Sequence, residues 1–419
     1  MATIHKELTA HQVNAIEAPE QGQLFVRDTM LKGLALRVTT GGSKAFIVES
    51  WVNGRSRRVT LGKHPALSLK DARKRAREVI GQFASGRDVV AERINRKALR
   101  VTLATVYQDY MASRDLKPRT VDDYAKVLRL AFSDWQSKPI TSITRNMVEK
   151  RHGQMGESSP TSANKSMRVL RALFNFAIGK YEKADGSPII TDNPTRRLSA
   201  TRSWYRVERK QTLIRPEQLP QWFRAVLTLK PEQPTSKADV VRDYLLLLIL
   251  TGLRREEAAR LPWCDVDLQG KTITIRDTKN RHTHELPLSD YLHQLLSQRK
   301  EQANGSRYVF AGDGKGGYLV EPKRWLQKVT KQSGVPFTIH DLRRTFITIA
   351  ESLDIPAYAL KRLLNHKSGG DVTAGYIIMD VERLREPMQR ITDFILKAGG
   401  VKQGAEVVNL TKRLKTDKR

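Results

Sequence analysis

One apolar stretch constrains the fold of this 419-residue chain more than any other feature of its sequence. Every residue from Tyr244 to Leu250 is apolar, and the run lies inside a longer segment of helical character, Asp239 to Thr251. A helix that crosses a membrane needs about 20 apolar residues, so this run is far too short to span a bilayer. It is instead typical of a helix buried at the centre of a globular domain.

Residues 212–390 form the predicted domain around that helix. Most of it is expected to be helical, with one small sheet whose strands are predicted at Asp265 to Leu268, Lys271 to Arg276 and Glu285 to Leu288. Residues 391–419 are assigned to a C-terminal tail, because the end of the chain is too polar and basic to pack firmly.

Residues 1–95 are predicted to fold separately, as a three-stranded sheet followed by one helix. The strands and the capped helix are expected at Leu34 to Val38, Ala45 to Trp51, Arg57 to Leu61, and Ser68 to Ala84. Asn53-Gly54 predicts a hairpin turn, since both residues tolerate positive φ. The alternation directs Val59 and Leu61 toward the helix and Arg58 to the opposite face. A basic sheet of this kind fits a DNA major groove.

Residues 100–185 are predicted to form an all-helical domain, so the fold class is multidomain and mainly α, with small β-sheets. Thr102, Thr120 and Thr144 each precede an apolar-periodic stretch and are candidate N-caps. The fourth helix, Ser162 to Tyr181, has an apolar stripe and a basic face. The stripe contains Met167, Leu170, Leu173, Phe174 and Ala177, and the basic face contains Lys165, Arg168 and Arg171. Residues 186–211 contain Gly186, Pro188, Pro194 and five arginines, and they predict a basic linker between domains.

The net charge of +30, from 74 basic and 44 acidic residues, is spread over all of these domains. Such a surplus favours a polyanionic partner, because Lys and Arg side chains that neutralise phosphates release condensed counterions. Ribosomal and membrane-surface proteins are basic too, so charge alone leaves those classes open. The N-terminus has no apolar signal segment, and the single cysteine, Cys264, fits a reducing cytoplasm.

Six residues supply the groups that attack on a phosphodiester requires: Arg254, Lys279, His340, Arg343, His366 and Tyr376. The phenol is the candidate nucleophile, the guanidinium groups hold the charge that develops on the phosphate, and the other groups move protons. This chemistry needs no metal and no other cofactor. The ordered set predicts an enzyme that breaks and rejoins DNA through a tyrosine.

Local spacing supports these roles. Arg254 begins a helix, and Glu257 lies three residues on along the same face, where it can orient Arg254. His340 and Arg343 have the same spacing and can face one phosphate together. Lys279 lies in a predicted turn between two strands, from which its flexible amine can protonate a leaving 5′ oxygen.

Several segments resemble those of the tyrosine recombinases, the phage integrase family. Thr251-Gly252-Leu253-Arg254-Arg255-Glu256-Glu257 is similar to the family's first box, and His340-Asp341-Leu342-Arg343-Arg344-Thr345-Phe346 is similar to its second. Leu363-Leu364-Asn365-His366, followed by Tyr376, resembles the nucleophile segment. The stretches 33–38 and 60–69 resemble the arm-site-binding domain of phage and genomic-island integrases.

The resemblance implies a site-specific recombinase that integrates and excises a mobile element in the cytoplasm of a bacterial host, associated with the nucleoid. Residues 1–95 would bind arm-type sites, 100–185 core-type sites, and 212–390 would be the α+β catalytic domain. A homotetramer would exchange strands through a 3′-phosphotyrosyl intermediate and a four-way junction, with an excisionase and a DNA-bending host protein as further candidate partners. The candidate DNA contacts are Arg55, Arg57, Arg58, Lys165, Arg168, Arg171, Arg202 and Arg206.

Two positions depart from the family pattern. Asn365 stands where the family commonly has glycine, and Tyr376 follows His366 by ten positions instead of the usual nine. Two alternatives stay open: an enzyme that resembles type IB topoisomerases, and a non-catalytic DNA-binding regulator. His282 and His284 would share one face of a strand, but a third metal ligand at suitable spacing is missing.

Overall fold

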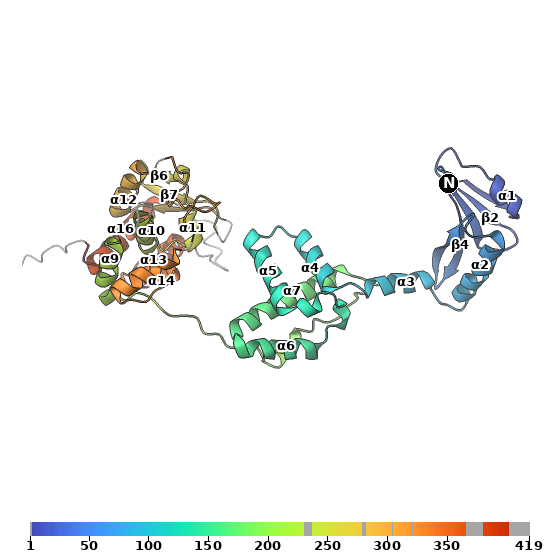
Figure 1. Ribbon diagram of the computed structural model, residues 1–419, viewed down its shortest axis with the longest axis horizontal. Helices are drawn as coiled ribbons and strands as arrows, with labels where there is room; N and C mark the ends of the chain where they lie inside the picture. Colours follow the sequence, from blue (N-terminus) through green and yellow to red (C-terminus); the bar gives the residue numbers. More distant parts are fainter. Residues whose placement is uncertain are drawn as a thin grey trace, which may run out of the picture. The chain divides into compact units, whose positions relative to one another are not determined.

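The computed structural model describes residues 2–229, 237–278, 282–303, 305–320, 322–365 and 380–401. They form two compact units, one within Met1–Glu208 and the other within Arg209–Arg419. Figure 1 shows the elements of each unit, which are mainly helices with one small sheet apiece. The predicted fold class is therefore confirmed.

The first unit begins with a five-stranded sheet in the order β1-β2-β3-β4-β5. Its elements are β1 (Ala2–Lys6), α1 (Ala10–Ala15), β2 (Gln23–Asp28), β3 (Leu34–Thr39), β4 (Lys44–Val52), β5 (Arg55–Lys63), α2 (Leu69–Ala84) and α3 (Val89–Ala98). The three predicted strands and the predicted helix are confirmed as β3, β4, β5 and α2. The prediction of three strands in all is wrong, because β1 and β2 extend the sheet. β1 is an edge strand whose side chains are all exposed, so it has no apolar alternation to mark it.

The two faces of this sheet differ in what covers them. Helix α2 packs on one face, where Val59 and Leu61 contact the core as predicted. A small apolar cluster, Phe25, Ala35 and Ile47, occupies the other face. There the Arg58 guanidinium lies 4.7 Å from the centre of the Phe25 ring, and Glu49 accepts hydrogen bonds from both Arg27 and Arg58. This second face thus has a buried apolar centre with arginine side chains around it.

The hairpin between β4 and β5 turns at Asn53-Gly54, where φ is 51° and 74°. Both residues occupy the left-handed region, as the sequence predicts.

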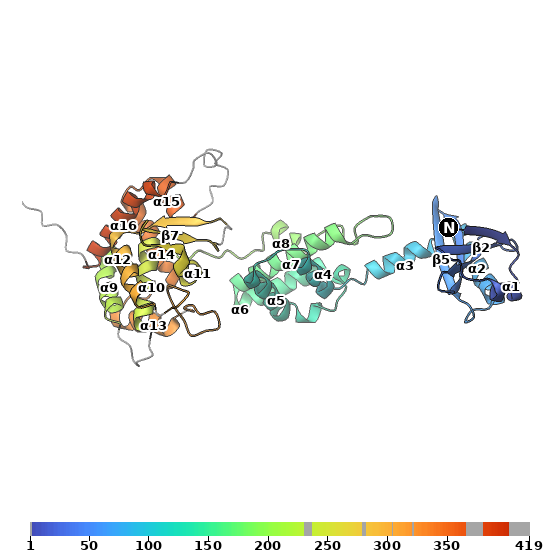
Figure 2. The ribbon, with the colours of Figure 1, turned by 90° about the horizontal axis from the view of Figure 1, so that it is seen from above.

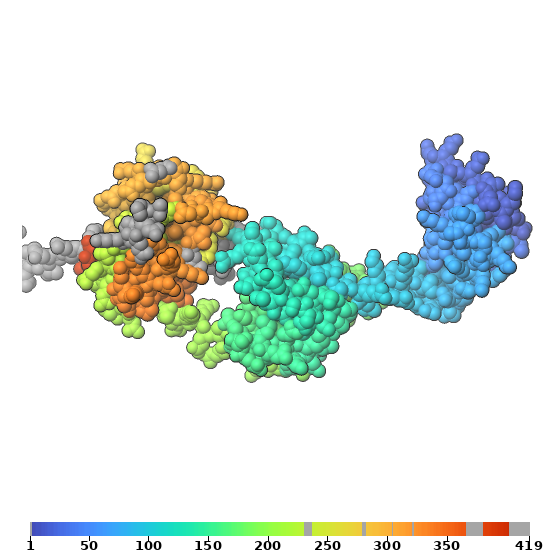
Figure 3. Space-filling model, viewed as in Figure 1, coloured from blue at the N-terminus to red at the C-terminus, as the bar shows by residue number. Residues whose placement is uncertain are grey.

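Further along the chain, α3 has no fully buried residue, and Figure 3 shows it as a segment one helix thick.

A helical domain completes the first unit. Its elements are α4 (Leu103–Ala112), α5 (Pro118–Ala131), η1 (Ser133–Trp135), η2 (Ile140–Ser142), α6 (Arg145–Ser158), α7 (Pro160–Lys180) and α8 (Arg196–Ala200). Thr102 and Thr144 cap α4 and α6 as predicted. The prediction for Thr120 is wrong, because Pro118 begins α5 and its fixed φ suits the first helical position. The predicted stripe of α7 is buried, and its three basic residues are exposed.

Much of the segment from 186 to 211 is folded onto this helical domain. Ile189 and Leu198 are buried in its core. Asn164 Nδ2 donates to the Tyr205 carbonyl oxygen at 2.9 Å, and the Tyr205 ring fills the space beside Gly156 where a Cβ atom would lie. Residues 186–205 therefore belong to the helical domain, in place of the interdomain linker that the sequence predicts from residue 186. Residues 206–211 are exposed and contain no helix or strand.

The second unit is built around the apolar helix, α10. Its described elements are η3 (Pro216–Gln218), α9 (Leu219–Leu227), α10 (Ala238–Thr251), α11 (Arg255–Ala259), η4 (Trp263–Asp265), β6 (Val266–Asp267), β7 (Thr272–Ile275), β8 (His284–Pro287), α12 (Asp290–Glu301), α13 (Lys323–Ser333), α14 (Ile339–Ser352), α15 (Ala357–Leu363), η6 (Glu382–Leu384) and α16 (Arg385–Ala398). The three predicted strands are confirmed as the antiparallel sheet β6-β7-β8.

Helix α10 lies at the centre of this unit, as predicted. All residues from Asp243 to Thr251 are buried, and α9, α12, α14 and α16 pack around the helix (Figures 1 and 2). None of the helices that the structure describes has the length and hydropathy that crossing a bilayer requires. The helix ends at Gly252, where φ is 65° and an added Cβ would lie 2.7 Å from the Phe346 ring. Only glycine fits this turn, and the turn leads directly into Arg254.

Candidate active site

Arg254 is fixed by Glu257 at the start of α11. The Arg254 backbone N–H donates to Glu257 Oε2 at 3.0 Å, and Arg254 Nη1 donates to Glu257 Oε1 at 2.8 Å. The Glu257 side chain is only 4% exposed, whereas that of Arg254 is 25% exposed. The predicted orienting contact is therefore present, and it leaves part of the guanidinium accessible to a ligand.

Arg343 joins three segments that are far apart in the sequence. It lies on α14 and is buried, with Nη1 donating to the Gly252 carbonyl oxygen at 2.5 Å and Nη2 donating to the Leu364 carbonyl oxygen at 2.7 Å. Gly252 lies two residues before Arg254, and Leu364 ends α15. These bonds bring the two arginine segments of the sequence into one site.

The side chains of Arg254, Arg343 and Glu257 together carry a net positive charge, which favours the binding of an anion. Burial, and then the neighbouring positive charge of Arg254, lower the pKa of Arg343 to about 10, while the Glu257 carboxylate acts in the opposite direction. The guanidinium remains a cation at neutral pH. Among these three side chains two positive charges meet one negative charge. A phosphate that bound here would supply the missing negative charge.

His340 lies three residues before Arg343 on α14, and its side chain is exposed. Partial burial, followed by the charges of Arg344 and Arg343, lowers the pKa of His340 below its usual value of 6.5. The ring is therefore neutral at pH 7, and it can accept a proton.

The first turn of α14 is held by a network on its other side. Asp341 Oδ2 accepts from the Thr338 backbone N–H at 2.8 Å, and Asp341 Oδ1 accepts from Thr212 Oγ1 at 2.7 Å and from Arg344 Nη1 at 2.6 Å. The Ile214 backbone N–H donates to Thr345 Oγ1 at 2.9 Å. The segment at which the chain enters this unit is thus bonded to the helix that carries His340 and Arg343.

His284 is a further buried residue of this site, and the sequence did not indicate that it lies there. Its Nε2 atom lies 2.8 Å from the Arg362 carbonyl oxygen, and Figure 2 shows α15 beside the sheet that contains β8. The prediction that His282 and His284 share a strand face is wrong, because β8 begins at His284 and His282 is exposed before it. Among the described residues no group of His, Cys, Asp and Glu side chains could hold a metal ion.

Three predicted site residues, Lys279, His366 and Tyr376, lie outside the described residues. The last described residue before His366 is Asn365, and its φ is 48°. Glycine and asparagine are the residues that most readily adopt this left-handed conformation. Asn365 therefore meets the same backbone requirement as the glycine that the family commonly has there.

The predicted DNA contacts differ in their surroundings. On β5, Arg58 lies on the open face of the sheet, whereas Arg57 is directed to the α2 side, where its Nε donates to Asp88 Oδ2 at 2.7 Å. Arg55 Nη1 donates to the Ala184 carbonyl oxygen at 3.3 Å. On α7, Lys165 is paired with Asp123 at 2.8 Å.

The remaining predicted contacts are exposed. Arg168 and Arg171 lie on the outer face of α7, with the Arg171 guanidinium 5.8 Å from the centre of the Trp204 ring. Arg202 and Arg206 lie near the end of the first unit, and the Arg206 side chain is 92% exposed.

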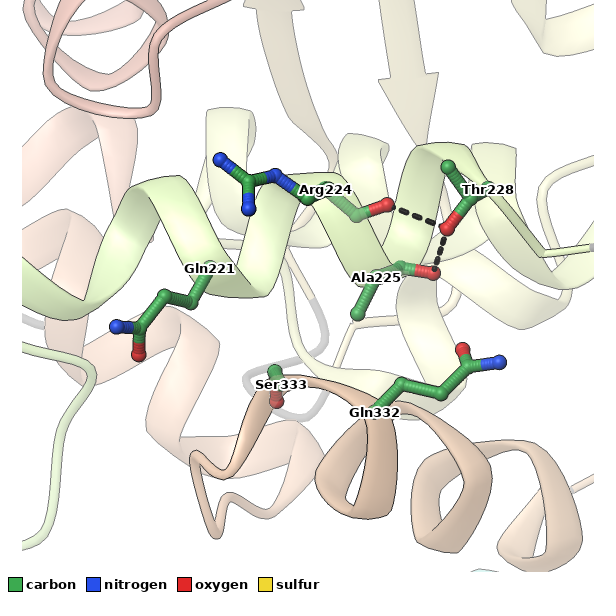
Figure 4. A pocket seen from close by; sticks show the side chains of 6 residues that line it. All are labelled: Gln221, Arg224, Ala225, Thr228, Gln332 and Ser333. Carbon is green, nitrogen blue, oxygen red and sulfur yellow. Dashed lines mark hydrogen bonds between the residues drawn. The ribbon is translucent and has the colours of Figure 1, made fainter.

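A hollow of about 480 Å³ lies between α9 and α13 in the second unit (Figure 4). It is lined by Gln221, Arg224, Ala225, Thr228, Gln332 and Ser333. None of these residues belongs to the predicted catalytic set, so this hollow is separate from the arginine site.

Comparison with known proteins identifies both ends of the chain. Residues 213–383 match the phage integrase family, and residues 8–96 match the arm DNA-binding domain. The prophage integrase IntF of Escherichia coli (strain K12) is 25% identical, over 96% of this chain and 93% of the relative. The integrase of Shigella phage Sf6 is 25% identical, over 93% of this chain and 98% of the relative.

Solved structures share the fold. A lambda integrase tetramer bound to a Holliday junction matches 83% of this chain and 98% of its own, with a TM-score of 0.52 and 21% identity. The Tn1549 transposon integrase in complex with transposon right end DNA matches 69% of this chain and 99% of its own, with a TM-score of 0.51 and 19% identity.

The family matches and the arginine site define a tyrosine recombinase, an enzyme that breaks and rejoins DNA. Residues 213–383 thus form a phage integrase domain and residues 8–96 an arm DNA-binding domain, which confirms the resemblance seen in the sequence.

Proposed function

We propose that this recombinase integrates a mobile DNA element at a specific attachment site and excises it again. The observation that supports this most strongly is the bond of Arg343 to the Gly252 carbonyl, because it brings the buried Arg343 and the partly exposed Arg254 into one cationic site for a phosphate. The relatives that align over nearly their whole length are prophage and phage integrases, which favours integration over other uses of the same chemistry.

In the proposed reaction, Tyr376 attacks the scissile phosphate. A bond forms between the phenolic oxygen and phosphorus, the bond from phosphorus to the 5′ oxygen breaks, and the product is a 3′-phosphotyrosyl ester with a free 5′ hydroxyl. Arg254 and Arg343 bind the non-bridging oxygens, whose negative charge increases in the transition state. Lys279 protonates the leaving 5′ oxygen. His340 and His366 accept or return the phenol proton.

The ester stores the energy of the broken bond, so rejoining runs as the reverse attack by a 5′ hydroxyl. We assign strand exchange to a homotetramer on a four-way junction, an assembly that the lambda integrase structure contains. The proposed partners that set the direction of recombination are an excisionase and a DNA-bending host protein. We assign the recombinase to the bacterial cytoplasm, where it would be associated with the nucleoid.

The division of labour follows the domains. We assign binding of arm-type sites to residues 1–95, through the uncovered sheet face around Arg58. Core-site binding is assigned to residues 100–185, with the exposed basic face of α7 toward the DNA. We assign the chemistry to residues 212–398, because Ile391, Ile395 and Leu396 of α16 are buried in the core of this domain and do not belong to the tail that the sequence predicts from residue 391. An arm-binding domain of this kind has no role in a topoisomerase that acts without paired sites, and it therefore disfavours that alternative.

A nicked half-site made from the element's own end tests this proposal. The nick lets the short 5′ product diffuse away, so that a covalent protein–DNA complex accumulates and survives SDS. We expect this complex from the wild type and none from Tyr376→Phe, which removes only the nucleophilic oxygen and leaves DNA binding unchanged.

Tyr358→Phe is the matched control, because Tyr358 is an exposed tyrosine of the same unit and should be dispensable. A complex that persists in Tyr376→Phe and disappears in Tyr358→Phe would reassign the nucleophile. Recombination between two complete attachment sites then separates an integrase from a topoisomerase, which would only relax the DNA.

A further inference from the structure

We propose that His284 is a positioning residue of the arginine site: its imidazole ties strand β8 to the last turn of α15, the turn whose Leu364 carbonyl also binds Arg343. This inference rests on the proposed role of Arg343 in holding the scissile phosphate.

The end of α15 is held from two sides. His284 is only 3% exposed, and its Nε2 atom lies 2.8 Å from the Arg362 carbonyl oxygen. From the other side, Arg343 Nη2 donates to the Leu364 carbonyl oxygen at 2.7 Å. The last carbonyl groups of a helix lack the usual bond to an N–H group four residues on. The Arg362 carbonyl oxygen accepts from the Asn365 backbone N–H at 3.0 Å, and its second lone pair can take the bond to His284. The two side chains thus bond to carbonyl groups that are two residues apart in the chain.

The bond to Arg362 defines the protonation of the ring. A carbonyl oxygen only accepts hydrogen bonds, so Nε2 carries the proton and Nδ1 is the bare nitrogen. Nδ1 is buried without a hydrogen-bond partner among the described residues. Burial lowers the pKa of His284 to about 4, and the charges of Glu257, Arg343 and Arg254 also act on the ring. The imidazole therefore lies beside the arginine site and is neutral there at pH 7.

A neutral donor suits this position for two reasons. It holds α15 without adding a third positive charge beside Arg254 and Arg343. By holding the turn that contains Leu364, it also fixes the plane of the Arg343 guanidinium. That guanidinium donates to the Gly252 and Leu364 carbonyl oxygens through two of its five N–H groups. If the turn with Leu364 shifts, the guanidinium turns with it and is no longer correctly oriented for a bound phosphate.

Two substitutions at His284 separate positioning from packing. His284→Leu keeps the apolar volume and removes the donor, whereas His284→Gln keeps an N–H donor at the distance of Nε2. The measurements are the single-turnover cleavage rate of the nicked half-site at saturating protein, the DNA dissociation constant and the thermal unfolding temperature. We expect His284→Leu to cleave about 10- to 100-fold more slowly, the effect of a small misplacement of a reacting group. The dissociation constant should stay unchanged, and His284→Gln should restore most of the rate.

His293 provides a matched control in the same unit. Its Nε2 atom lies 3.0 Å from the Leu268 carbonyl oxygen, so it makes the same kind of bond from α12. His293→Leu should therefore change the unfolding temperature to a similar extent and leave the cleavage rate at the wild-type value.

Three outcomes would overturn the inference. A wild-type cleavage rate in His284→Leu would mean that the ring only fills space. Equal slowing in His284→Leu and His284→Gln, or a parallel loss of DNA binding, would assign the residue to stability. The wild-type protein tests the proposed function in the same assay: if it forms no covalent complex, the proposed function itself fails.

Discussion

Replacing Arg343 should cost this recombinase both stability and cleavage, and the structure separates the two losses. Arg343→Ala leaves the buried carbonyl oxygens of Gly252 and Leu364 without their donors. Each buried unpaired polar group costs about 1–3 kcal/mol, or roughly 2–6 kcal/mol for the pair. In a unit of this size 1 kcal/mol lowers the unfolding temperature by about 2–4 °C, so we expect a fall of at least about 4 °C.

The cleavage rate should fall further than stability explains. Removing one preorganised donor to the transition state typically slows a reaction by about 100-fold or more. The rate should therefore be measured on the nicked half-site at saturating protein, at a temperature where calorimetry shows both proteins to be folded. Arg343→Lys should recover little of the rate, because an ammonium group cannot replace the planar fork that spans two carbonyls and a phosphate.

Arg344→Ala is the matched control for this experiment. Arg344 is the next residue on α14, it is bonded to Asp341 on the far side of the helix, and its side chain is 26% exposed. Its loss should slow cleavage far less than the loss of Arg343, because Arg344 acts on the site only through the Asp341 network and the pKa of His340. Full activity in Arg343→Lys, or equal slowing in Arg343→Ala and Arg344→Ala, would refute the assignment of Arg343 to the phosphate.

Three further predictions concern the other groups. Lys279→Ala should slow cleavage of ordinary DNA, and a substrate with sulfur at the leaving 5′ position should restore the rate, because a thiolate leaves without protonation. If the sulfur substrate gave no rescue, Lys279 would not be the group that protonates the leaving oxygen. Removal of residues 1–97 should abolish footprints on outlying arm-type sites while core cleavage persists, and Arg58→Ala in the full chain should reduce the salt slope of arm-site binding by about 1; identical footprints would contradict this. Because the pKa of His284 is about 4 in the folded chain against 6.5 in an unfolded one, the unfolded state takes up this proton first as the pH falls. Acidification from pH 6.5 to 4 should therefore remove up to about 3 kcal/mol of unfolding free energy that His284→Gln does not lose, as paired denaturation curves would show.

Local patterns in the sequence predicted much of this fold. The apolar run of α10, the Asn53-Gly54 turn and the N-caps Thr102 and Thr144 depend on neighbouring residues, and the structure contains each of them. The failures arise where a local pattern is absent or ambiguous. Every residue of strand β1 is exposed, and Pro118 overrides the capping signal of Thr120.

The site could be predicted only in part for the same reason. The contact between Arg254 and Glu257 spans three residues and follows from helical spacing. The bonds of Arg343 to Gly252 and Leu364 and of His284 to Arg362 join residues 21 to 91 positions apart. Such contacts depend on how helices and strands pack, and no spacing rule reaches that far. The sequence therefore gives no indication that His284 bonds to the Arg362 carbonyl.

The bond between Thr212 and Asp341 has a mechanical consequence. Residues 206–211 are the exposed connection between the two units, and immediately after them Thr212 and Ile214 are bonded to Asp341 and Thr345 on α14. Any tension in this connection would therefore act first on the helical turn that carries His340 and Arg343.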